Sequence, residues 1–294
     1  MFLSAYCIIN NNVINFIFIL QPQVRKELIN NSNKKLKPLK KFGQNYLQDK
    51  NILRKIVDEI NPQLKDNLIE IGPGQGSLTK ELFGKTELYT AVEIDSRVIE
   101  ELRNNYEGLN LVHADFLKLE LTNFGSFDNK IRIAGNIPYN LTSPIIFKLL
   151  ENRAIVKDAI LMIQLEVAQR IVSSIGTKDY GILSVILNAF ADIKLCFKVS
   201  PNVFYPRPKV YSAVIHINFH NDKKDYDENL FKSIVKAAFN QRRKTLRNSL
   251  GNSIFANINF EQCPIDLGLR AEQLSINDFI TLTNFIKQHQ THNQ

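Results

Sequence analysis

The chain has 294 residues, of which 44% are apolar, so it can bury one sizeable core and leave enough chain for a small second domain. Its formal net charge of +8 favours a polyanionic partner, although charge alone does not identify one. The three cysteines, Cys7, Cys196 and Cys263, are too few and too far apart for a zinc cluster or a disulfide framework. We therefore expect no metal site and a cytoplasmic location.

The amino-terminal segment is unusual because its first 24 residues carry no charge. Its apolar stretch is shorter than the roughly 20 residues that a membrane helix needs, and it lacks the positive region of a secretory signal. We expect residues 1–37 to be a poorly ordered extension, with no membrane association; a targeting or interaction segment is the alternative. From 33 to 41, five lysines and a proline predict a solvated arm.

The central part of the chain alternates between strand-like and helix-like runs. Apolar residues at helical spacing predict a first helix over 51–60. The alternation that follows indicates a mainly parallel sheet covered by helices. The expected strands are 67–71, 88–92, 109–112, 131–134 and 159–163, and the expected helices between or after them are 77–82, 96–105, 144–150 and 166–172.

The end of this region favours one class of α/β protein. A helix over 182–190 precedes strands at 193–199 and 210–219, which predict an antiparallel hairpin at one sheet edge. That ending is typical of methyltransferases and unusual in dehydrogenases. Beyond a charged linker, only helical periodicity remains. We predict a Rossmann-like, class I methyltransferase α/β domain over 38–222 and a small all-helical domain over 223–294.

A glycine-rich turn follows the first strand of the predicted sheet. Gly72, Gly74 and Gly76 allow a tight turn and the approach of a ligand without a Cβ in the way, so we expect Gly72 and Gly74 to bind a cofactor. The Gly-x-Gly-x-Gly spacing differs from the Gly-x-Gly-x-x-Gly of dinucleotide enzymes. A purely structural turn is the alternative.

Carboxylates follow the next two strands, at the sheet edge where ligands bind. Glu93 stands about 20 residues beyond the glycine turn, where it can accept hydrogen bonds from both hydroxyls of a ribose. Asp95 is better suited to cap the following helix. Asp115, after the third strand, is expected to reach the amino group of a cofactor adenine; a helix cap is its alternative role.

The segment after the fourth strand, Asn136-Ile137-Pro138-Tyr139, carries the most specific chemistry. An exocyclic adenine amine is a poor nucleophile because its lone pair is delocalised into the ring. If the Asn136 side-chain oxygen and the Pro138 carbonyl accept its two hydrogens, the nitrogen can aim its lone pair at a sulfonium methyl group. Tyr139 offers a flat face to an extruded base. A tight turn with a packing tyrosine is the bland alternative.

Two further segments point to a nucleic-acid substrate. In the proline-rich loop 200–210, Phe204 is expected to face the other side of the extruded adenine, unless it is only a core residue. Between 229 and 251 there are six basic residues and no acidic one, which suits phosphate contacts. We expect RNA to bind at Arg242, Arg243, Lys244 and Arg247. The alternative is a solvated helix face, with Arg242 or Arg243 paired to acids of the first domain.

With these motifs together, the sequence resembles the small-subunit ribosomal RNA adenine N6,N6-dimethyltransferase family from about 39 to 284. The resemblance implies that the segment 44–47 folds over S-adenosylmethionine. The sequence departs mildly from the family pattern, for example with Tyr46 where the family often has Phe. The cofactor contacts that the resemblance implies are Asn45, Leu47, Gly72, Glu93, Asp115 and Asn136.

The resemblance implies transfer of four methyl groups to two adjacent adenines in a hairpin near the 3′ end of small-subunit rRNA. We expect a monomer that acts on this rRNA or on an immature small subunit, with a role in subunit biogenesis. Ile137 is also favoured by macrolide-resistance methyltransferases of large-subunit rRNA, which are one alternative; the segment 239–250 argues for the small-subunit branch. A dehydrogenase and a non-catalytic assembly factor are the others.

Overall fold

The computed structural model describes residues 4–10, 13–19, 38–39 and 43–290. Within the extension, Ser4–Asn10 (β1) and Val13–Ile19 (β2) pair as an antiparallel hairpin, which the expectation of a poorly ordered segment did not include. The rest of 1–37, and all of the lysine-rich arm except its residues 38–39, lies outside the described residues. None of the described helices is long and apolar enough to cross a bilayer.

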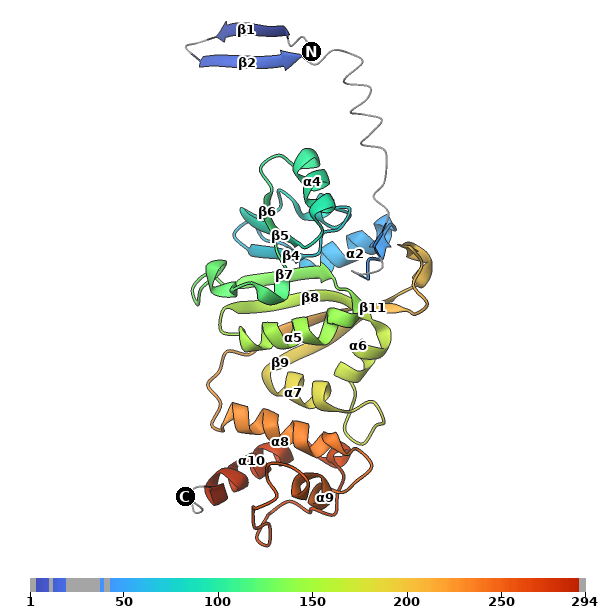
Figure 1. Ribbon diagram of the computed structural model, residues 1–294, viewed down its shortest axis with the longest axis vertical. Coiled ribbons are helices and arrows are strands. Elements are labelled where there is room, and N and C mark those ends of the chain that lie inside the picture. The colour runs from blue at the N-terminus through green and yellow to red at the C-terminus, as the bar shows by residue number, and fades with distance from the viewer. Residues whose placement is uncertain (1–3, 11–12, 20–37, 40–42, 291–294) are drawn as a thin grey trace.

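A seven-stranded sheet with the order β6-β5-β4-β7-β8-β11-β9 forms the centre of the molecule (Figure 1). The strands from β6 to β8 are parallel, and β11 runs antiparallel to both of its neighbours. This arrangement confirms the Rossmann-like sheet with an antiparallel edge hairpin. The strands are β4 (Asn67–Ile71), β5 (Leu88–Glu93), β6 (Asn110–His113), β7 (Ile131–Asn136), β8 (Val156–Gln164), β9 (Ala191–Val199) and β11 (Ser212–Phe219).

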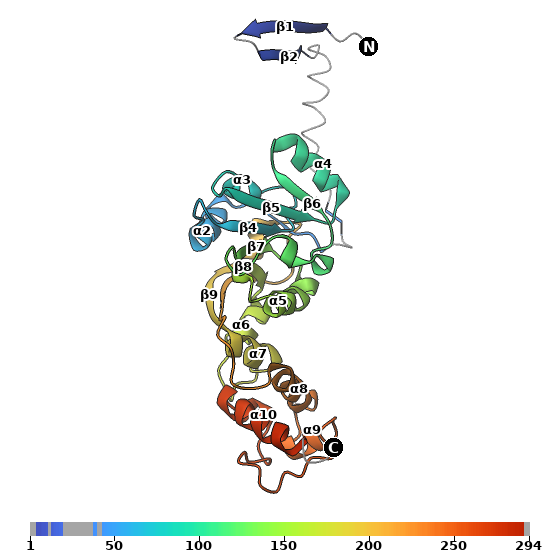
Figure 2. The ribbon, with the colours of Figure 1, turned by 90° about the vertical axis from the view of Figure 1, so that its left-hand side faces the viewer.

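Helices cover both faces of this sheet (Figure 2). One face packs on α2 (Lys50–Ile60) and α3 (Thr79–Leu82), and the other on α5 (Thr142–Glu151), α6 (Leu165–Ile171) and α7 (Ile182–Phe190). The helix α4 (Ser96–Asn105) packs on β5 and β6. Short 3-10 turns complete this region: η2 (Phe116–Lys118), η3 (Leu121–Asn123), η4 (Tyr139–Leu141) and η5 (Pro201–Val203).

A two-stranded sheet lies beside the main one. In it, β3 (Tyr46–Leu47) pairs with β10 (Phe204–Tyr205), with Leu47 opposite Phe204 and Tyr46 opposite Tyr205. Two segments far apart in the sequence, 43–47 and 200–211, are thereby held side by side. This pairing fixes the chain that precedes α2 against the loop between β9 and β11.

The carboxyl-terminal part is helical, as expected. It contains α8 (Glu228–Asn240), α9 (Leu246–Gly251), η6 (Ala271–Gln273) and α10 (Ile276–Gln290), which lie together at one end of the molecule in both views (Figures 1 and 2). Their buried side chains continue into the core of the sheet layer, because the ring of Phe231 meets Phe190 edge-on at a centroid distance of 6.0 Å. The helices therefore pack firmly on the sheet domain.

A buried ion network joins the strands at the sheet end opposite the carboxyl termini of the parallel strands. Arg132 of β7 is 6% exposed, and its guanidinium donates to Asp158 at 2.8 and 2.7 Å and to Asp66 at 2.6 Å. It also donates to the carbonyl of Ile60, at the end of α2. Burial opposes the charge of Asp158, but hydrogen bonds from His216 and Arg132 lower its pKa. The network thus connects α2, β7, β8 and β11.

Candidate active site

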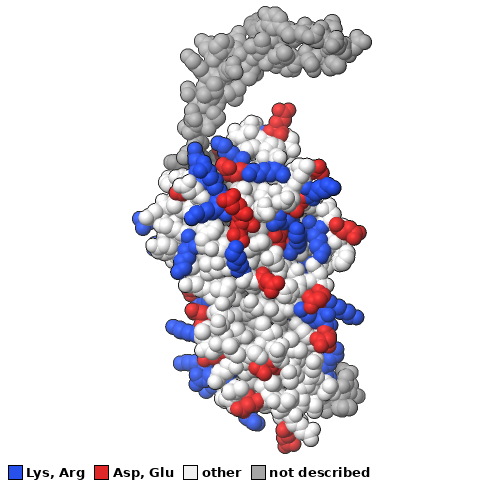
Figure 3. Space-filling view, turned by 180° about the vertical axis from the view of Figure 1, so that it is seen from behind, with Lys and Arg blue, Asp and Glu red and all other residues white. Residues whose placement is uncertain are grey.

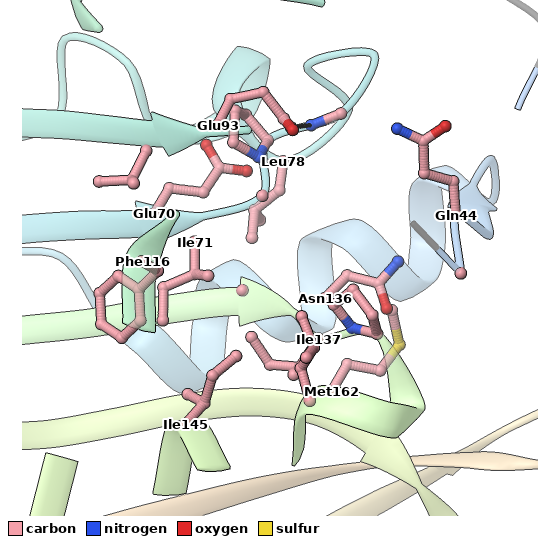
Figure 4. A pocket seen from close by; sticks show the side chains of 18 of the residues that line it. Gln44, Glu70, Ile71, Leu78, Glu93, Phe116, Asn136, Ile137, Ile145 and Met162 are labelled. Atoms are coloured by element: carbon pink, nitrogen blue, oxygen red, sulfur yellow. Dashed lines mark hydrogen bonds between the residues drawn. The ribbon is translucent and has the colours of Figure 1, made fainter. Parts of the chain in front are cut away.

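A cavity of about 280 Å³ lies at the carboxyl ends of β4, β5 and β7 (Figure 4). The strand order changes direction at β4, because β5 lies next to it on one side and β7 on the other. Open α/β sheets bind ligands at such a switch point. The segment 43–47 forms one wall, and the glycine turn, Glu93, Asp115 and the segment 135–141 form the others. All seven residues predicted to bind a cofactor thus line this one cavity.

The glycine turn has the backbone that its sequence predicts. Gly72 and Gly74 adopt φ values of +64° and +54°, in the left-handed region where a side chain is strained. A Cβ on Gly72 would meet nothing within 4 Å, so the space beside it is open to a ligand. A Cβ on Gly74 would instead lie 2.8 Å from the ring of Tyr46. Gly74 therefore makes room for a protein side chain as well as lining the cavity.

Glu93 is held rigidly at the end of β5. It is 5% exposed, one oxygen accepts from the amides of Ile94 and Asp95 at 2.8 and 2.9 Å, and the other accepts from Gly74 at 3.1 Å. Burial raises the pKa of Glu93, although the hydrogen bonds from these three amides act to lower it. Asp95 caps α4, as expected, by accepting from the amide of Arg97, and it does not line the cavity.

Asp115 has the capping role that was its alternative, and it also lies at the cavity. Its Oδ1 accepts from the amide of Leu117 at 3.0 Å and so caps η2, yet the residue also lines the cavity. A carboxylate has two oxygens, and capping uses one of them. Its contact with a cofactor adenine stays a prediction.

The end of β7 and the segment that follows it are held by hydrogen bonds within the protein. The side-chain amide of Asn136 donates to the carbonyl of Asn45 at 2.8 Å, which leaves its oxygen, Oδ1, available to accept a hydrogen. The Pro138 carbonyl accepts from Leu141 at 2.9 Å and keeps a second lone pair. A hydrogen bond of 2.9 Å joins the Tyr139 hydroxyl to Ser212, so the tyrosine ring is fixed at the cavity wall.

The wall formed by 43–47 is anchored at both ends. Gln44 donates to Asp95 at 3.1 Å, and β3 pairs with β10. Leu47 is 4% exposed and lines the cavity with Asn45. Nothing in the local pattern of Asn45 or Leu47 indicates this position; only the family resemblance placed them here.

The structure does not bring Phe204 to the cavity. It is 6% exposed and packs in the core beneath α2, as the core alternative predicts. Its expected contact with a target base stays a prediction. Two other aromatic residues of the same loop region, Tyr205 and Tyr211, are each 54% exposed.

Glu70, a carboxyl of β4 that lines the cavity, was not among the residues predicted from the sequence. It is 2% exposed, and its Oε2 accepts from the hydroxyls of Thr79, at 2.7 Å, and Tyr89. Burial raises the pKa of Glu70 to about 7. One acidic residue within an apolar strand is the signal that could have found it.

Glu70→Gln should change how stability depends on pH. The unfolded chain ionises Glu70 above about pH 4.5 and the folded one only near 7, so wild-type stability should fall as pH rises through this window. The fall amounts to about 3 kcal/mol at most. Glutamine can keep both hydroxyl bonds without the charge. Urea unfolding should show that the free energy of unfolding of the variant rises relative to that of wild type between pH 5 and pH 8. The same difference between the two proteins at both pH values would contradict this account. The exposed Glu120→Gln is the control.

The basic residues predicted to bind RNA do not share one helix face. Arg242, Arg243 and Lys244 lie in the turn between α8 and α9, and Arg247 is on α9. Arg242 pairs with Glu272 at 3.2 Å and donates to two carbonyls of the loop before α7, so it has partners within the protein. The other three are exposed.

The charge is mixed on the face shown in Figure 3. Lys and Arg side chains are dense over the sheet domain there, but acidic side chains lie among them. The net charge of +8 therefore does not form one continuous basic surface on this face. A local cluster, such as the turn before α9, is the better candidate for a phosphate contact.

Comparisons with known proteins agree with this architecture. A "Ribosomal RNA adenine dimethylase" family model matches residues 17–288. The "Ribosomal RNA small subunit methyltransferase A" of Chlorobium phaeobacteroides (strain BS1) is 46% identical over 243 residues, covering 83% of this chain and 91% of that protein. The protein of the same name from Francisella tularensis subsp. novicida (strain U112) is 44% identical over 86% of this chain and 98% of its own length.

Two solved structures are similar along most of the chain. A dimethyladenosine transferase from Plasmodium falciparum has a TM-score of 0.72 and 25% identity, covering 83% of this chain and 98% of its own. The 23S rRNA methyltransferase ErmE has a TM-score of 0.62 and 25% identity, covering 83% and 100%. The family match spans most of the 294 residues, and the cavity carries the strand-end residues expected from the sequence. The chain belongs to the ribosomal RNA adenine dimethylase family.

Proposed function

We propose that this chain transfers methyl groups from S-adenosylmethionine to the N6 amines of two adjacent adenines near the 3′ end of small-subunit rRNA. The observation that carries the proposal is the bond from the Asn136 side-chain nitrogen to the Asn45 carbonyl, which leaves the amide oxygen able to accept a hydrogen bond from a substrate amine. The relatives at 44–46% identity are named for the small subunit, and this favours it over the large subunit as the source of the adenines.

The residues of the cavity fit S-adenosylmethionine. The open space at Gly72 suits close approach of a ligand to the backbone, and the fixed carboxylate of Glu93, which already accepts three amides, can accept from a hydroxyl of a ribose. Asp115 stands at the next strand end, within the same cavity, and suits an adenine amino group. When bound, S-adenosylmethionine would supply an electrophilic methyl group; S-adenosylhomocysteine would be the leaving group, and the methylated nitrogen would release one proton to solvent.

Asn136 and Pro138 activate the amine by position. The Asn136 Oδ1 and the free lone pair of the Pro138 carbonyl accept the two N6 hydrogens, which favours a pyramidal nitrogen with its lone pair directed at the methyl group. Tyr139, held by Ser212, supports the plane of the base. In the second transfer one hydrogen remains, so one acceptor is enough.

RNA is held in part by exposed cations of the turn before α9 and of the start of α9 itself. Reversing Arg243 and Arg247 to glutamate should weaken RNA binding and lower the slope of log affinity against log salt by about 1 for each lost phosphate contact. Affinity for S-adenosylmethionine should not change. Filter binding of RNA at several salt concentrations measures the RNA affinity and its salt slope.

A control variant reverses two positive charges at the opposite end of the sheet. Lys65 precedes β4 and Lys157 lies near the start of β8, so both exposed lysines stand at the sheet end away from the cavity. Reversing these two should leave RNA affinity near that of wild type. Equal losses in the two double variants would mean that net charge, and not the turn before α9, holds the RNA.

The substrate is tested by incubating the protein with labelled S-adenosylmethionine and unmodified small subunits, large subunits or naked rRNA, and then mapping the modified adenines. We expect dimethylation of two adjacent adenines near the 3′ end of small-subunit rRNA. Label confined to large-subunit rRNA would instead support the macrolide-resistance alternative. The absence of transfer to any of the three would support a non-catalytic assembly factor.

A further inference from the structure

The hydroxyl of Tyr46 is buried at the edge of the cavity without a partner. Tyr46 is 7% exposed and lines the cavity, and no group in the part of the chain that the structure describes hydrogen-bonds its hydroxyl. A buried hydroxyl that forms no hydrogen bond is costly, so such a group calls for a ligand or a specific reason.

The hydroxyl cannot easily turn out to solvent. The Tyr46 backbone pairs with Tyr205 of β10, and its ring lies against the backbone of Gly74. Gln44, two residues before it, is bonded to Asp95. These contacts hold the ring between the glycine turn and the start of α4.

The charges around this hydroxyl decide which ligand group it suits. Burial, followed by the fields of Glu93 and Asp95, raises the pKa of Tyr46 to about 12, so it stays a donor at neutral pH. Glu101, whose own Oε2 is buried without a partner, adds a further negative field. Although Arg97 offsets part of this charge, it is paired with Asp95. A ligand carboxylate would be repelled here, whereas a ligand hydroxyl can accept from a tyrosine and donate to a carboxylate.

We propose that the Tyr46 hydroxyl donates a hydrogen bond to a ribose hydroxyl of S-adenosylmethionine, and that the same ribose hydroxyl donates to Glu93. Tyr46 is then a specificity residue for the ribose. This inference rests on the proposed function, because it places S-adenosylmethionine in the cavity.

The test compares wild type with Tyr46→Phe by isothermal titration against S-adenosylhomocysteine and its 2′-deoxy and 3′-deoxy ribose analogues. The variant should bind S-adenosylhomocysteine about 5- to 10-fold more weakly, the effect of one neutral hydrogen bond. Against one of the two deoxy analogues, wild type and variant should bind equally, because the accepting hydroxyl is gone. Equal affinities of the two proteins for all three ligands would overturn the proposal.

Two further measurements separate binding from structure. Tyr106→Phe is the matched control, since its hydroxyl contacts the carbonyl of Gly76 at 3.4 Å outside the cavity lining, and it should bind S-adenosylhomocysteine as wild type does. Without ligand, Tyr46→Phe should melt no lower than wild type, because it removes an unpaired hydroxyl. A lower melting temperature, with the same loss of affinity for all three ligands, would show a structural role and overturn the assignment.

The failure of this inference is distinguishable from failure of the proposed function. A wild-type protein that binds no S-adenosylhomocysteine, and transfers no methyl group, would contradict the proposed function itself. A wild type that binds and transfers, alongside a Tyr46→Phe variant with wild-type affinity for every ligand, contradicts only the role of Tyr46.

Discussion

Asn136→Ala is expected to lower kcat for methyl transfer by about 100- to 1000-fold, the effect of losing one positioned hydrogen-bonding group at a reacting centre. The alanine removes the oxygen that would hold the substrate amine. It also removes the amide that donates to Asn45, so the wall 43–47 loses one of its anchors. The variant should therefore also bind S-adenosylmethionine more weakly, but by a much smaller factor than the loss in kcat.

Single-turnover transfer at saturating S-adenosylmethionine separates these two effects. The rate of label transfer to rRNA reports the positioning of the amine, and titration of the methyl donor reports the state of the wall. Asn123→Ala, an exposed change in η3, serves as the control and should leave both quantities unchanged. An Asn136→Ala variant that still carried out full dimethylation at the wild-type rate would contradict the mechanism.

Arg132→Leu is expected to destabilise the fold by about 3–5 kcal/mol, because it leaves buried carboxylates without their cation. Asp158 is 2% exposed and accepts two hydrogen bonds from Arg132, and Asp66 accepts a third. The change also leaves the carbonyl of Ile60 without the guanidinium that now donates to it. All of these groups lie away from the cavity, so the loss should be one of stability alone.

Urea unfolding measures this loss, and a second substitution tests its cause. Asp158→Asn in the Arg132→Leu background removes one of the buried charges that have lost Arg132 and should recover part of the stability. His216, which bonds Asp158 at 2.9 Å, stays in both variants and cannot account for the difference. A loss below about 1 kcal/mol for Arg132→Leu would show that its burial and pairing contribute little.

The ion network also explains where the sequence predicted the fold imperfectly. The bounds of α4 and α7 match the expectation because each has an uninterrupted apolar period. In contrast, β8 begins three residues earlier than expected, at Val156, because Lys157 and Asp158 interrupt the apolar run. The partner that makes Asp158 acceptable inside the sheet, Arg132, lies on another strand. Local pattern cannot reveal such a pairing.

Other differences between the expected and observed elements have local causes. The helix expected over 77–82 is a single turn, Thr79–Leu82, because the turns that follow Pro73 continue as far as Leu78. The β1–β2 hairpin of the extension was not expected, since the uncharged segment shows no strand alternation distinct from that of a short apolar helix.

The candidate site was predicted best where function follows from position along a strand. Glu93, Asp115 and Asn136 could be placed together because parallel strands end at the same edge of a sheet. Phe204 and Arg242 were harder, since their surroundings depend on contacts with distant segments, Leu47 for the first and Glu272 for the second. The raised pKa of Glu70 depends on complete burial, which no local pattern gives.

The most direct test of the central claim is a structure of the protein with S-adenosylhomocysteine and an adenosine, or with a short substrate RNA. The account predicts the N6 nitrogen at about 2.7–3.2 Å from both the Asn136 Oδ1 and the Pro138 carbonyl oxygen, with the sulfur on the lone-pair side. An adenine amine directed away from these two oxygens, or a nicotinamide nucleotide held in the cavity in place of the methyl donor, would contradict it.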